Sequence, residues 1–311
     1  MIETSPTICA GIVSYNPEIG RLDANLLSVS KQVSRVFVVD NGSDNINEIE
    51  ELLSRYSCID LLRNKANEGI AKALNQLVKA AELAGFNHIL FLDQDSVSTD
   101  GMVNVLSQFV GERIGIVAPQ IIDRNKESID DIDSALDHKT YFVETAARKG
   151  VITSGSLTNI QVCKQIGGFD ENMFIDYVDY DLNKRLLLEG YKIIRTGDTA
   201  LIHECGKAVP TWLKTPRKGQ DGKWRLERFY SFGHSPFRCY YKARNRVIYS
   251  RKYKDCDQSR SFEGTLQIAP QIALTLLFEQ DRKAKLGAFI RGIHDGCRSD
   301  VERYVVKGRG K

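Results

Sequence analysis

The chain has 311 residues, of which 42% are apolar and 27% are charged, and its formal net charge at pH 7 is only +3. These values are typical of a folded globular protein with one large domain or two smaller ones, and they exclude an intrinsically disordered chain. Because no run of about 18 apolar residues occurs, we also expect no helix that spans a membrane.

Short apolar runs rich in β-branched residues alternate with segments of helical period in the N-terminal part of the chain. The clearest helical segment covers residues 69–85, where apolar side chains recur three and four positions apart. This alternation predicts an α/β fold with an open, doubly wound, mostly parallel, Rossmann-like sheet, which we assign to residues 1–206. The expected strands are Ile8–Ser14, Arg35–Asp40, Ile59–Arg63, Asn87–Asp93 and Gly115–Pro119.

Two acidic residues, Asp40 and Asp93, end strands of this sheet, and ligands bind beyond the carboxyl ends of such strands. Asp40 can accept a hydrogen bond from a pyrimidine base or a ribose, or it can belong to an ordinary Asp-Asn-Gly-Ser turn. The first strand is not followed by a GxGxxG turn, and no GxxxxGK[ST] motif occurs. These absences argue against a dinucleotide enzyme and a P-loop NTPase.

The sequence Asp93-Gln94-Asp95 places two carboxylates on one face of an extended segment. Hard oxygen ligands of this kind suit Mg²⁺ or Mn²⁺ shared with phosphate oxygens. Loop acids that cap a following helix are an alternative. A third interpretation is the DxDx[TV] nucleophile loop of haloacid-dehalogenase-type phosphatases, with Asp93 as nucleophile, although that loop normally follows the first strand of its domain.

The segment before the 69–85 helix is a further candidate for phosphate binding. Asn67 can cap the helix, and the first backbone amides of the helix would point at a diphosphate.

Three acids, Asp176, Asp179 and Asp181, stand within six residues and lead into a helix expected at 181–189. Such a cluster can supply one positioned carboxylate as a general base, and we choose Asp179, with helix capping as the alternative for each acid. His203 follows a further expected strand, where it is either structural or a metal ligand.

Beyond residue 205 the β/α alternation is lost. Pro210, Pro216 and the charged run Lys218–Lys223 indicate a loop or lid, and residues 265–278 and 286–293 are expected to be helical. Residues 207–311 carry 24 Lys and Arg against 10 Asp and Glu, whereas residues 1–206 carry 19 against 30. This basic, aromatic-rich, mostly helical region can meet an anionic acceptor or membrane surface, form a solvated face without a partner, or serve a non-enzymatic binding scaffold.

Taken together, these segments resemble family 2 glycosyltransferases of the GT-A fold, and within them the bacterial rhamnosyltransferases. The resemblance covers roughly residues 7–250. It is carried by the segments Val13 to Asn16, Val39 to Ser43, Asn67 to Asn75, Leu92 to Asp95, Gly167 to Asp170, Phe174 to Leu182, and His203.

The resemblance implies an inverting, metal-dependent glycosyltransferase that uses Mg²⁺ or Mn²⁺. It implies dTDP-L-rhamnose as donor and a lipid-diphosphate-linked saccharide as acceptor, in the synthesis of bacterial surface polysaccharide. Many members of the family have Glu-Asp at the catalytic position, whereas this chain has Val178-Asp179, which leaves Asp176 as a rival base.

The resemblance also implies the roles of individual residues. The donor would contact Tyr15, Asn16, Asp40, Asn67, Gly69, Asn75 and Asp93; the metal would contact Asp93, Asp95 and His203; the acceptor would lie near Arg244 and Asn245.

The seven cysteines are odd in number and form no CxxC pair, and the N-terminus does not resemble a signal peptide. We therefore expect a cytoplasmic protein, peripheral at the inner face of the cell membrane if the basic region binds there, with no nucleic acid partner. The oligomeric state does not follow from the sequence.

Overall fold

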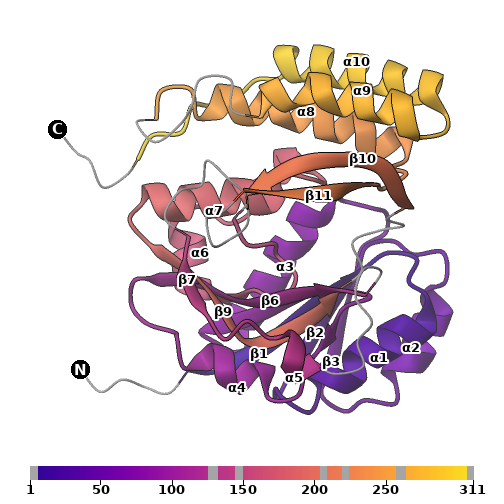
Figure 1. Cartoon of the computed structure of the whole chain (residues 1–311). Helices are drawn as coiled ribbons and strands as arrows, with labels where there is room; N and C mark the ends of the chain where they lie inside the picture. The colour runs from indigo at the N-terminus through magenta and orange to yellow at the C-terminus, as the bar shows by residue number, and fades with distance from the viewer. Residues whose placement is uncertain are drawn as a thin grey trace. The chain divides into compact units, whose positions relative to one another are not determined.

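The computed structural model describes residues 6–124, 132–143, 150–203, 209–218, 224–256 and 264–306. The chain divides into two compact units. The first comprises Met1–His203 with Cys256–Gln258 and Val305–Lys311, and the second comprises Glu204–Asp255 and Ser259–Tyr304. The first unit holds a large sheet, whereas the second holds a hairpin and three long helices (Figure 1).

A nine-stranded sheet forms the centre of the first unit, within the described part of the chain. Its strand order is β3-β2-β1-β4-β8-β6-β9-β5, with β7 beside β9. The strands are β1 (Ile8–Ser14), β2 (Val36–Asp40), β3 (Ile59–Arg63), β4 (His88–Asp93), β5 (Val97–Ser98), β6 (Ile114–Asp123), β7 (Thr140–Phe142), β8 (Leu157–Asn159) and β9 (Lys192–His203).

The expected α/β sheet is confirmed, with a parallel half and a mixed half. Strands β3, β2, β1 and β4 are all parallel. β6 does not continue this run, because β8 pairs antiparallel with both β4 and β6, and β6 pairs parallel with β9. Since β2 and β4 flank β1 on opposite sides, the strand order reverses at β1, and such a point opens a crevice at the carboxyl ends of the strands.

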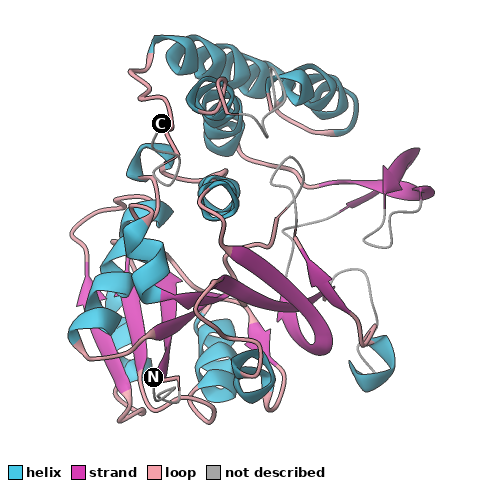
Figure 2. Cartoon of the chain, turned by 90° about the vertical axis from the view of Figure 1, so that its left-hand side faces the viewer, coloured by secondary structure: helices cyan, strands magenta, loops and turns pink. Residues whose placement is uncertain are grey.

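Helices cover both faces of this sheet (Figures 1 and 2). α1 (Ile19–Val29), α2 (Ile46–Leu53) and α4 (Met102–Ser107) pack on one face, where their buried side chains form one apolar cluster with those of the strands. The other face carries α3 (Ile70–Leu83), α6 (Ile160–Gln165) and α7 (Val178–Leu188). Two short helices complete the unit, α5 (Ile132–Ala135) and the 3-10 turn η1 (Glu171–Met173).

The predicted helix at 69–85 is confirmed as α3, and its apolar stripe is buried as expected. Its close approach to the sheet occurs at Gly11 of β1. A Cβ atom there would lie 2.8 Å from the side chain of Ile89 and 3.1 Å from that of Leu77. Helix α3 is therefore held directly above β1, with its N-terminus toward the carboxyl rim of the strands.

The second unit begins with an antiparallel hairpin of β10 (Val209–Lys218) and β11 (Trp224–Ser231). Here the loop expectation was wrong, because Pro210 and Pro216 lie within β10. Proline is tolerated in edge strands, and both strands of this two-stranded sheet are edges. Residues 219–223 of the expected charged lid lie outside the described residues.

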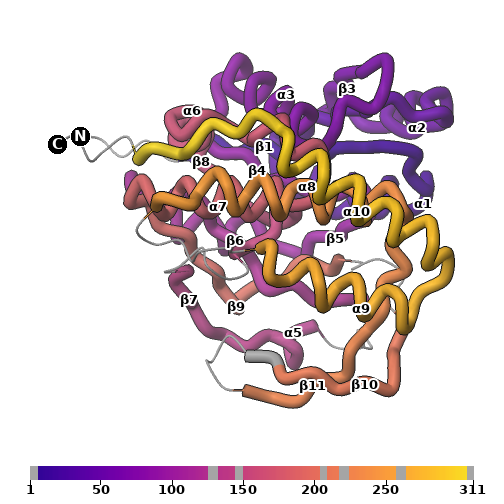
Figure 3. Tube along the Cα trace, turned by 90° about the horizontal axis from the view of Figure 1, so that it is seen from above, coloured from indigo at the N-terminus to yellow at the C-terminus, as the bar shows by residue number. Residues whose placement is uncertain are grey.

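Three helices follow the hairpin: α8 (Pro236–Lys252), α9 (Ile268–Phe278) after the 3-10 turn η2 (Thr265–Gln267), and α10 (Arg282–Arg298). Figure 3 shows them from above. The helices expected at 265–278 and 286–293 are thus present, and the second is longer than predicted. No helix in the described part of the chain has both the length and the apolar character needed to cross a bilayer.

Glycines allow α8 and α10 to pack closely. A Cβ atom on Gly292 would lie 2.3 Å from the carbonyl oxygen of Tyr240, and one on Gly296 would lie 2.7 Å from that of Arg244. Together with Ala288, which is fully buried, these residues repeat every four positions along one face of α10.

Candidate functional site

The turns that follow β1, β2 and β4 are tied to one another by polar side chains. Asn16 has a positive φ of 46°; its backbone N–H donates to Ser43 Oγ at 2.8 Å, and its Oδ1 accepts from the N–H of Asp44 at 2.7 Å. The N–H of Tyr15 donates to Gln94 Oε1 at 2.8 Å, while the Tyr15 ring is 45% exposed. The three turns therefore form one rim, with the Tyr15 ring open to solvent.

Asp40 lies at the end of β2 and is buried. Its Oδ2 accepts from the N–H groups of Gly42 and Ser43 at 3.2 and 3.1 Å, which is the turn geometry that the sequence allowed. Its Oδ1 is also buried and has no hydrogen-bond partner among the described residues. A buried carboxylate oxygen without a donor is costly, so this atom suits a donor group brought by a ligand.

A network of side-chain amides shapes the segment before α3. Asn41 donates to Asn67 Oδ1 at 3.0 Å, and Asn67 Oδ1 also accepts from the N–H of Gly69 at 3.0 Å. Asn67 is thus not the N-cap of α3; that position belongs to Gly69, whose φ is 87°. A Cβ atom on Gly69 would lie 2.7 Å from the ring of Phe174.

The expectation that the first amides of α3 point at a diphosphate needs a correction at Ile70. The N–H of Ile70 donates to the carbonyl oxygen of Phe174 at 2.7 Å, so this amide is already occupied. Asn75, about one turn further along α3, holds the 169–171 segment by two hydrogen bonds. Its Oδ1 accepts from the N–H of Phe169 at 2.8 Å, and its Nδ2 donates to the Phe169 carbonyl at 2.9 Å. Both groups of the Asn75 amide are therefore used to hold that loop.

Asp93 and His203 face each other across the rim, although they end different strands, β4 and β9. Asp93 Oδ2 lies 3.9 Å from His203 Nε2. Two serines orient them: Ser154 Oγ accepts from the N–H of Asp93 at 2.9 Å, and Ser96 Oγ bonds both Ser154 Oγ at 2.9 Å and His203 Nδ1 at 3.0 Å. With Nδ1 engaged by Ser96, Nε2 is the nitrogen that points at Asp93.

The Asp93–His203 pair would need a small adjustment to hold a divalent ion. Two ligands that each lie about 2.1 Å from Mg²⁺ are about 3.0 Å apart at an octahedral angle of 90° and about 4.2 Å apart at 180°, and the observed 3.9 Å lies between these values. No group of three His, Cys, Asp or Glu residues that could hold a metal occurs among the described residues. A site with few protein ligands is usual for Mg²⁺, which completes its shell with water and substrate phosphates.

Asp95 is the third expected metal ligand, two residues beyond Asp93. Its side chain is partly buried and makes no hydrogen bond or ion pair with a described residue. The structure thus brings Asp93 and His203 together, and it leaves the carboxylate of Asp95 available nearby in the chain.

The segment before α7 is strained. Phe174, Asp176 and Tyr177 all have positive φ, between 53° and 69°, and none of them is glycine. Each such residue costs about 1–3 kcal/mol, and strain of this kind concentrates at functional sites. The strained turn delivers Asp179 into the first turn of α7.

Asp179 has a pKa raised from 3.8 to about 6. Its burial is the main cause, since the charged carboxylate loses hydration, and the negative charges of Asp176 and Asp93 raise the pKa further. The N–H of Tyr180, 2.9 Å from Asp179 Oδ1, partly opposes the shift. A carboxylate with such a pKa is poised as a base near neutral pH.

Asp181 has a structural role. It is fully buried and forms an ion pair with Arg185, whose Nε donates to Asp181 Oδ2 at 2.8 Å and whose Nη2 lies 2.7 Å from the same oxygen. Arg185 also donates to the carbonyl of Ile166 at 2.8 Å, which fixes α7 to the end of α6.

The expected acceptor residues Arg244 and Asn245 belong to α8 in the second unit. Asn245 is fully buried, and Arg244 Nη1 donates to its Oδ1 at 3.0 Å. Sequence reasoning missed Ser96 and Ser154, which orient Asp93 and His203. Ser96 directly follows the Asp93-Gln94-Asp95 motif and could have been noticed, whereas nothing in the sequence around Ser154 marks it.

Comparisons with known proteins agree on one family. The model of glycosyl transferase family 2 matches residues 9–164. A dTDP-rhamnosyl transferase, RfbF, from Shigella flexneri is 30% identical over 261 residues, which are 79% of this chain and 80% of the relative.

Solved structures share the fold. S. aureus TarS 1-349 matches with a TM-score of 0.59 and 14% identity, over 92% of this chain and 81% of that one. Its complex with UDP-GlcNAc matches with a TM-score of 0.56 and 15% identity, over 94% and 81%. GalNAc-T7 with UDP, GalNAc and Mn²⁺ matches with a TM-score of 0.58 and 14% identity over 94% of this chain, which spans only 57% of that structure. The fold is therefore of the GT-A type.

Proposed function

Because the chain belongs to glycosyltransferase family 2 and is a glycosyltransferase, we propose that it is an inverting, metal-dependent rhamnosyltransferase. In this proposal it moves L-rhamnose from dTDP-L-rhamnose to a saccharide carried on a lipid diphosphate, in the synthesis of bacterial surface polysaccharide. The observation that carries the proposal is the convergence of Asp93, His203 and Asp179. Asp93 and His203 face each other at 3.9 Å, and the negative charge of Asp93 helps to raise the pKa of Asp179.

The donor preference rests on the similarity to RfbF, whose name includes dTDP-rhamnosyl transfer. In the rim itself, the partnerless Oδ1 of Asp40 would accept a hydrogen bond from the base or ribose, and the exposed Tyr15 ring would lie against the nucleotide. Asn16, Asn67, Gly69 and Asn75 would act by shaping the rim, since the structure gives their polar groups partners within the protein.

Mg²⁺ or Mn²⁺ would be held by Asp93 and His203, with Asp95 as a further ligand, and when bound it would offset negative charge on the diphosphate of the donor. The serine pair would keep His203 in the tautomer whose Nε2 is free to bind the ion.

In the transfer step, Asp179 would take the proton of an acceptor hydroxyl while the oxygen of that hydroxyl bonds to the anomeric carbon of the donor sugar. The bond from that carbon to the diphosphate oxygen breaks, and dTDP leaves on the opposite face, so that a single displacement inverts the anomeric configuration. Burial would sharpen this role, because a carboxylate that has lost hydration is a stronger base than one in water.

The acceptor and the location of the enzyme are proposed from the basic second unit. A lipid-linked diphosphate is anionic, and residues 207–311 carry 24 basic against 10 acidic residues. We place the enzyme at the inner face of the cell membrane, with Arg244 toward the acceptor and the buried Asn245 as the residue that holds Arg244.

Titration with sugar nucleotides, with and without Mn²⁺, tests the donor and the metal together. We expect dTDP-rhamnose to bind tightly only with the ion, and Asp95→Ala to remove that dependence. Equal affinity with and without metal in the unmodified protein would refute the metal role. Tight binding of a different sugar nucleotide would refute the donor.

The choice between Asp179 and Asp176 as base is tested by single-turnover rates. Asp179→Asn should bind donor normally and lose several orders of magnitude in transfer rate. Survival of turnover in Asp179→Asn, together with its loss in Asp176→Asn, would assign the base to Asp176.

Family membership argues against the two other functions that the sequence allowed. Asp93 ends β4, the fourth strand along the chain, whereas the phosphatase nucleophile follows the first strand of its domain. A scaffold without activity would not need the oriented Asp93–His203 pair or a strained turn before Asp179.

A further inference from the structure

Helix α9 has an unusual composition for an exposed helix. Its eleven residues, Ile268–Phe278, include no charged side chain, and a helix that is apolar all round is normally buried. Only Ile268 and Thr275 are buried here. One face, formed by Leu266 of the preceding turn with Ala269, Pro270, Ala273 and Leu277, is exposed, and Leu266 and Leu277 are 73% and 54% exposed.

Helix α10 presents a different exposed face. At 100° per residue, Lys283, Ile290, Arg291, His294, Cys297 and Arg298 fall within one third of the helix circumference, and all six are exposed. The face opposite packs on α8 through Ala288, Gly292 and Gly296. The exposed face of α10 therefore combines cations with the apolar Ile290, which is 58% exposed.

No acid in the described part of the chain neutralises three of these cations. Lys283, Arg291 and Arg298 make no ion pair with any residue in the described ranges. Two of the acids nearby are engaged elsewhere: Glu279 pairs with the buried Lys285 at 2.9 Å, and Asp295 accepts from Tyr240 at 2.8 Å.

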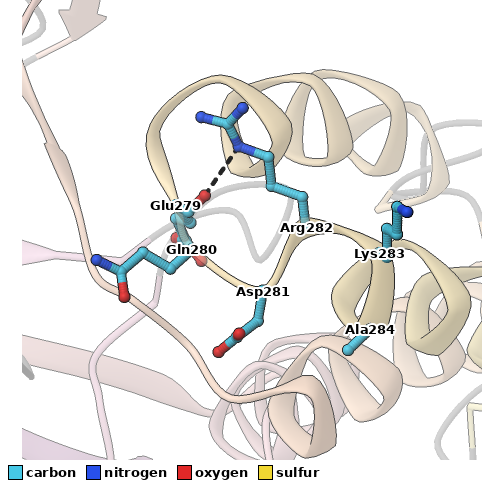
Figure 4. Close-up of a pocket in the computed structure, with 6 residues that line it drawn as sticks. All are labelled: Glu279, Gln280, Asp281, Arg282, Lys283 and Ala284. Carbon is cyan, nitrogen blue, oxygen red and sulfur yellow. Dashed lines mark hydrogen bonds between the residues drawn. The ribbon is translucent and has the colours of Figure 1, made fainter.

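The turn that joins the two helices is an open pocket lined by residues 279–284 (Figure 4). Arg282 bends back to the carbonyl oxygen of Glu279 at 3.1 Å, whereas the side chain of Lys283 extends away from that contact. Beside the end of α9, the ring of Trp212 lies 5.6 Å from that of Phe278, and Trp212 is 76% exposed. An exposed aromatic residue thus lies beside the C-terminal end of α9.

We propose that these exposed faces of α9 and α10, together the α9–α10 surface, bind a bilayer that contains anionic lipid. An uncharged apolar helix that neighbours a helix whose exposed cations pair with no described residue has the composition of helices that lie in a membrane interface. Charge complementarity selects anionic lipid, since each basic residue near such a surface strengthens binding about fivefold. The inference rests on the proposed function, because a lipid-linked acceptor lies at that surface, but its test does not need the acceptor.

The test is cosedimentation of the full chain with vesicles of phosphatidylcholine, with and without phosphatidylglycerol. We expect binding only to the anionic vesicles, weakening as salt is raised. The triple variant Lys283→Ser, Arg291→Ser and Arg298→Ser should bind about 100-fold more weakly, following the fivefold effect of each charge. Leu277→Ser should also weaken binding.

Matched controls lie in the first unit. Lys31, Lys79 and Arg113 are exposed and without an ion pair to a described residue, so their triple replacement by Ser removes the same charge. Leu83, which is 78% exposed, matches Leu277. Both control variants should bind vesicles as the unmodified chain does. The chain has two tryptophans, Trp212 and Trp224, both in the hairpin, and a blue shift of their fluorescence should accompany binding.

Binding that ignores lipid charge, or an equal loss in the first-unit triple variant, would overturn the proposal. So would a dimer, seen in sedimentation velocity, that Leu277→Ser dissociates while vesicle binding stays intact, since a second copy would then cover the face. Titration with dTDP-rhamnose and Mn²⁺ without vesicles separates the two hypotheses. The α10 triple variant should bind donor normally, and failure of the unmodified chain to bind donor would refute the proposed function alone.

Discussion

Asp179 is the residue whose surroundings most directly link fold to chemistry. The turn before it stores strain at Phe174, Asp176 and Tyr177, and the carboxylate that follows is partly buried beside two other acids. Both the backbone strain and the burial of the carboxylate lower the free energy of unfolding. Such costs are typical of a site where a base is shielded from water until an acceptor binds.

The raised pKa of Asp179 predicts the pH dependence of transfer. Below a pKa of about 6 the carboxyl is protonated and cannot take a proton, so kcat/KM should fall tenfold per pH unit as the pH drops below about 6. Asp176→Asn removes a negative charge that raises this pKa, and the acid limb should move to lower pH. An acid limb of the kcat/KM profile at the same pH in Asp176→Asn would contradict the conclusion that the charge of Asp176 raises the pKa of Asp179.

The same shift predicts an effect on stability. A carboxyl whose folded pKa lies above its unfolded value contributes stability that is fully present below about 3.8 and is lost as the pH rises through about 6. Asp179→Asn should therefore stabilise the chain at pH 7 by about 1–3 kcal/mol and have little effect at pH 4. Denaturant unfolding at both pH values measures this, and an equal effect at the two would count against the shift.

At the scale of elements, the N-terminus of α3 and the strained turn depend on each other through Gly69. This residue has a φ of 87°, and a Cβ atom would meet the ring and carbonyl of Phe174. Gly85, at the other end of α3, has a similar φ of 83° but nothing within 4 Å of such an atom. Substitutions at Gly69 and Gly85 therefore distinguish the cost of backbone strain from the cost of a packing clash.

We expect Gly85→Ala to cost about 1 kcal/mol of unfolding free energy from backbone strain alone. Gly69→Ala should cost about 3 kcal/mol, because the clash with Phe174 adds to the strain. It should also weaken donor binding, whereas Gly85→Ala should not. Equal losses of unfolding free energy for Gly69→Ala and Gly85→Ala in denaturant titrations would mean that the turn at Phe174 moves aside without cost for the new methyl group.

Helix α10 offers a second matched pair. Gly292 lies against the Tyr240 carbonyl, while a Cβ atom on Gly287 would meet only the end of the Arg291 side chain at 3.4 Å. Gly287→Ala should stabilise the chain by about 0.5–1 kcal/mol, through helix propensity. Gly292→Ala should destabilise it by about 1–3 kcal/mol despite the same gain, because α8 and α10 must separate. Thermal unfolding of both variants checks the opposite signs.

The parallel strands and α3 were predictable because their signals are local. Apolar runs and a three–four repeat stand in consecutive residues, and strand ends then place Asp40 and Asp93 on one rim. What sequence missed depends on contacts far apart in the chain. Ser154 is 61 residues from Asp93, the Ile70 amide is taken by Phe174, and the hairpin contains prolines that only an edge strand tolerates.

At the scale of the whole molecule, the two units differ in how their apolar surface is used. In the first unit, six of the seven residues of β1 are buried, and helices cover both faces of the sheet. In the second unit, the exposed large apolar side chains include Trp212, Trp224, Leu226, Leu266, Leu277 and Ile290. The basic unit therefore exposes more large apolar side chains than the acidic unit, in which Tyr15, Leu27, Leu83 and Phe142 are exposed.

This difference predicts an ordering of amide hydrogen exchange within the full chain. Protection follows burial and local contact, so β1, β2 and β4 should exchange slowest and α9 fastest among the long helices, since only two of its residues are buried. Mass spectrometry of peptic peptides measures both. Anionic vesicles should slow exchange in α9 and α10 without changing that of β1, because only the α9–α10 surface meets the lipid. If α9 is already as protected as β1 in free protein, its exposed face is covered by something other than a bilayer.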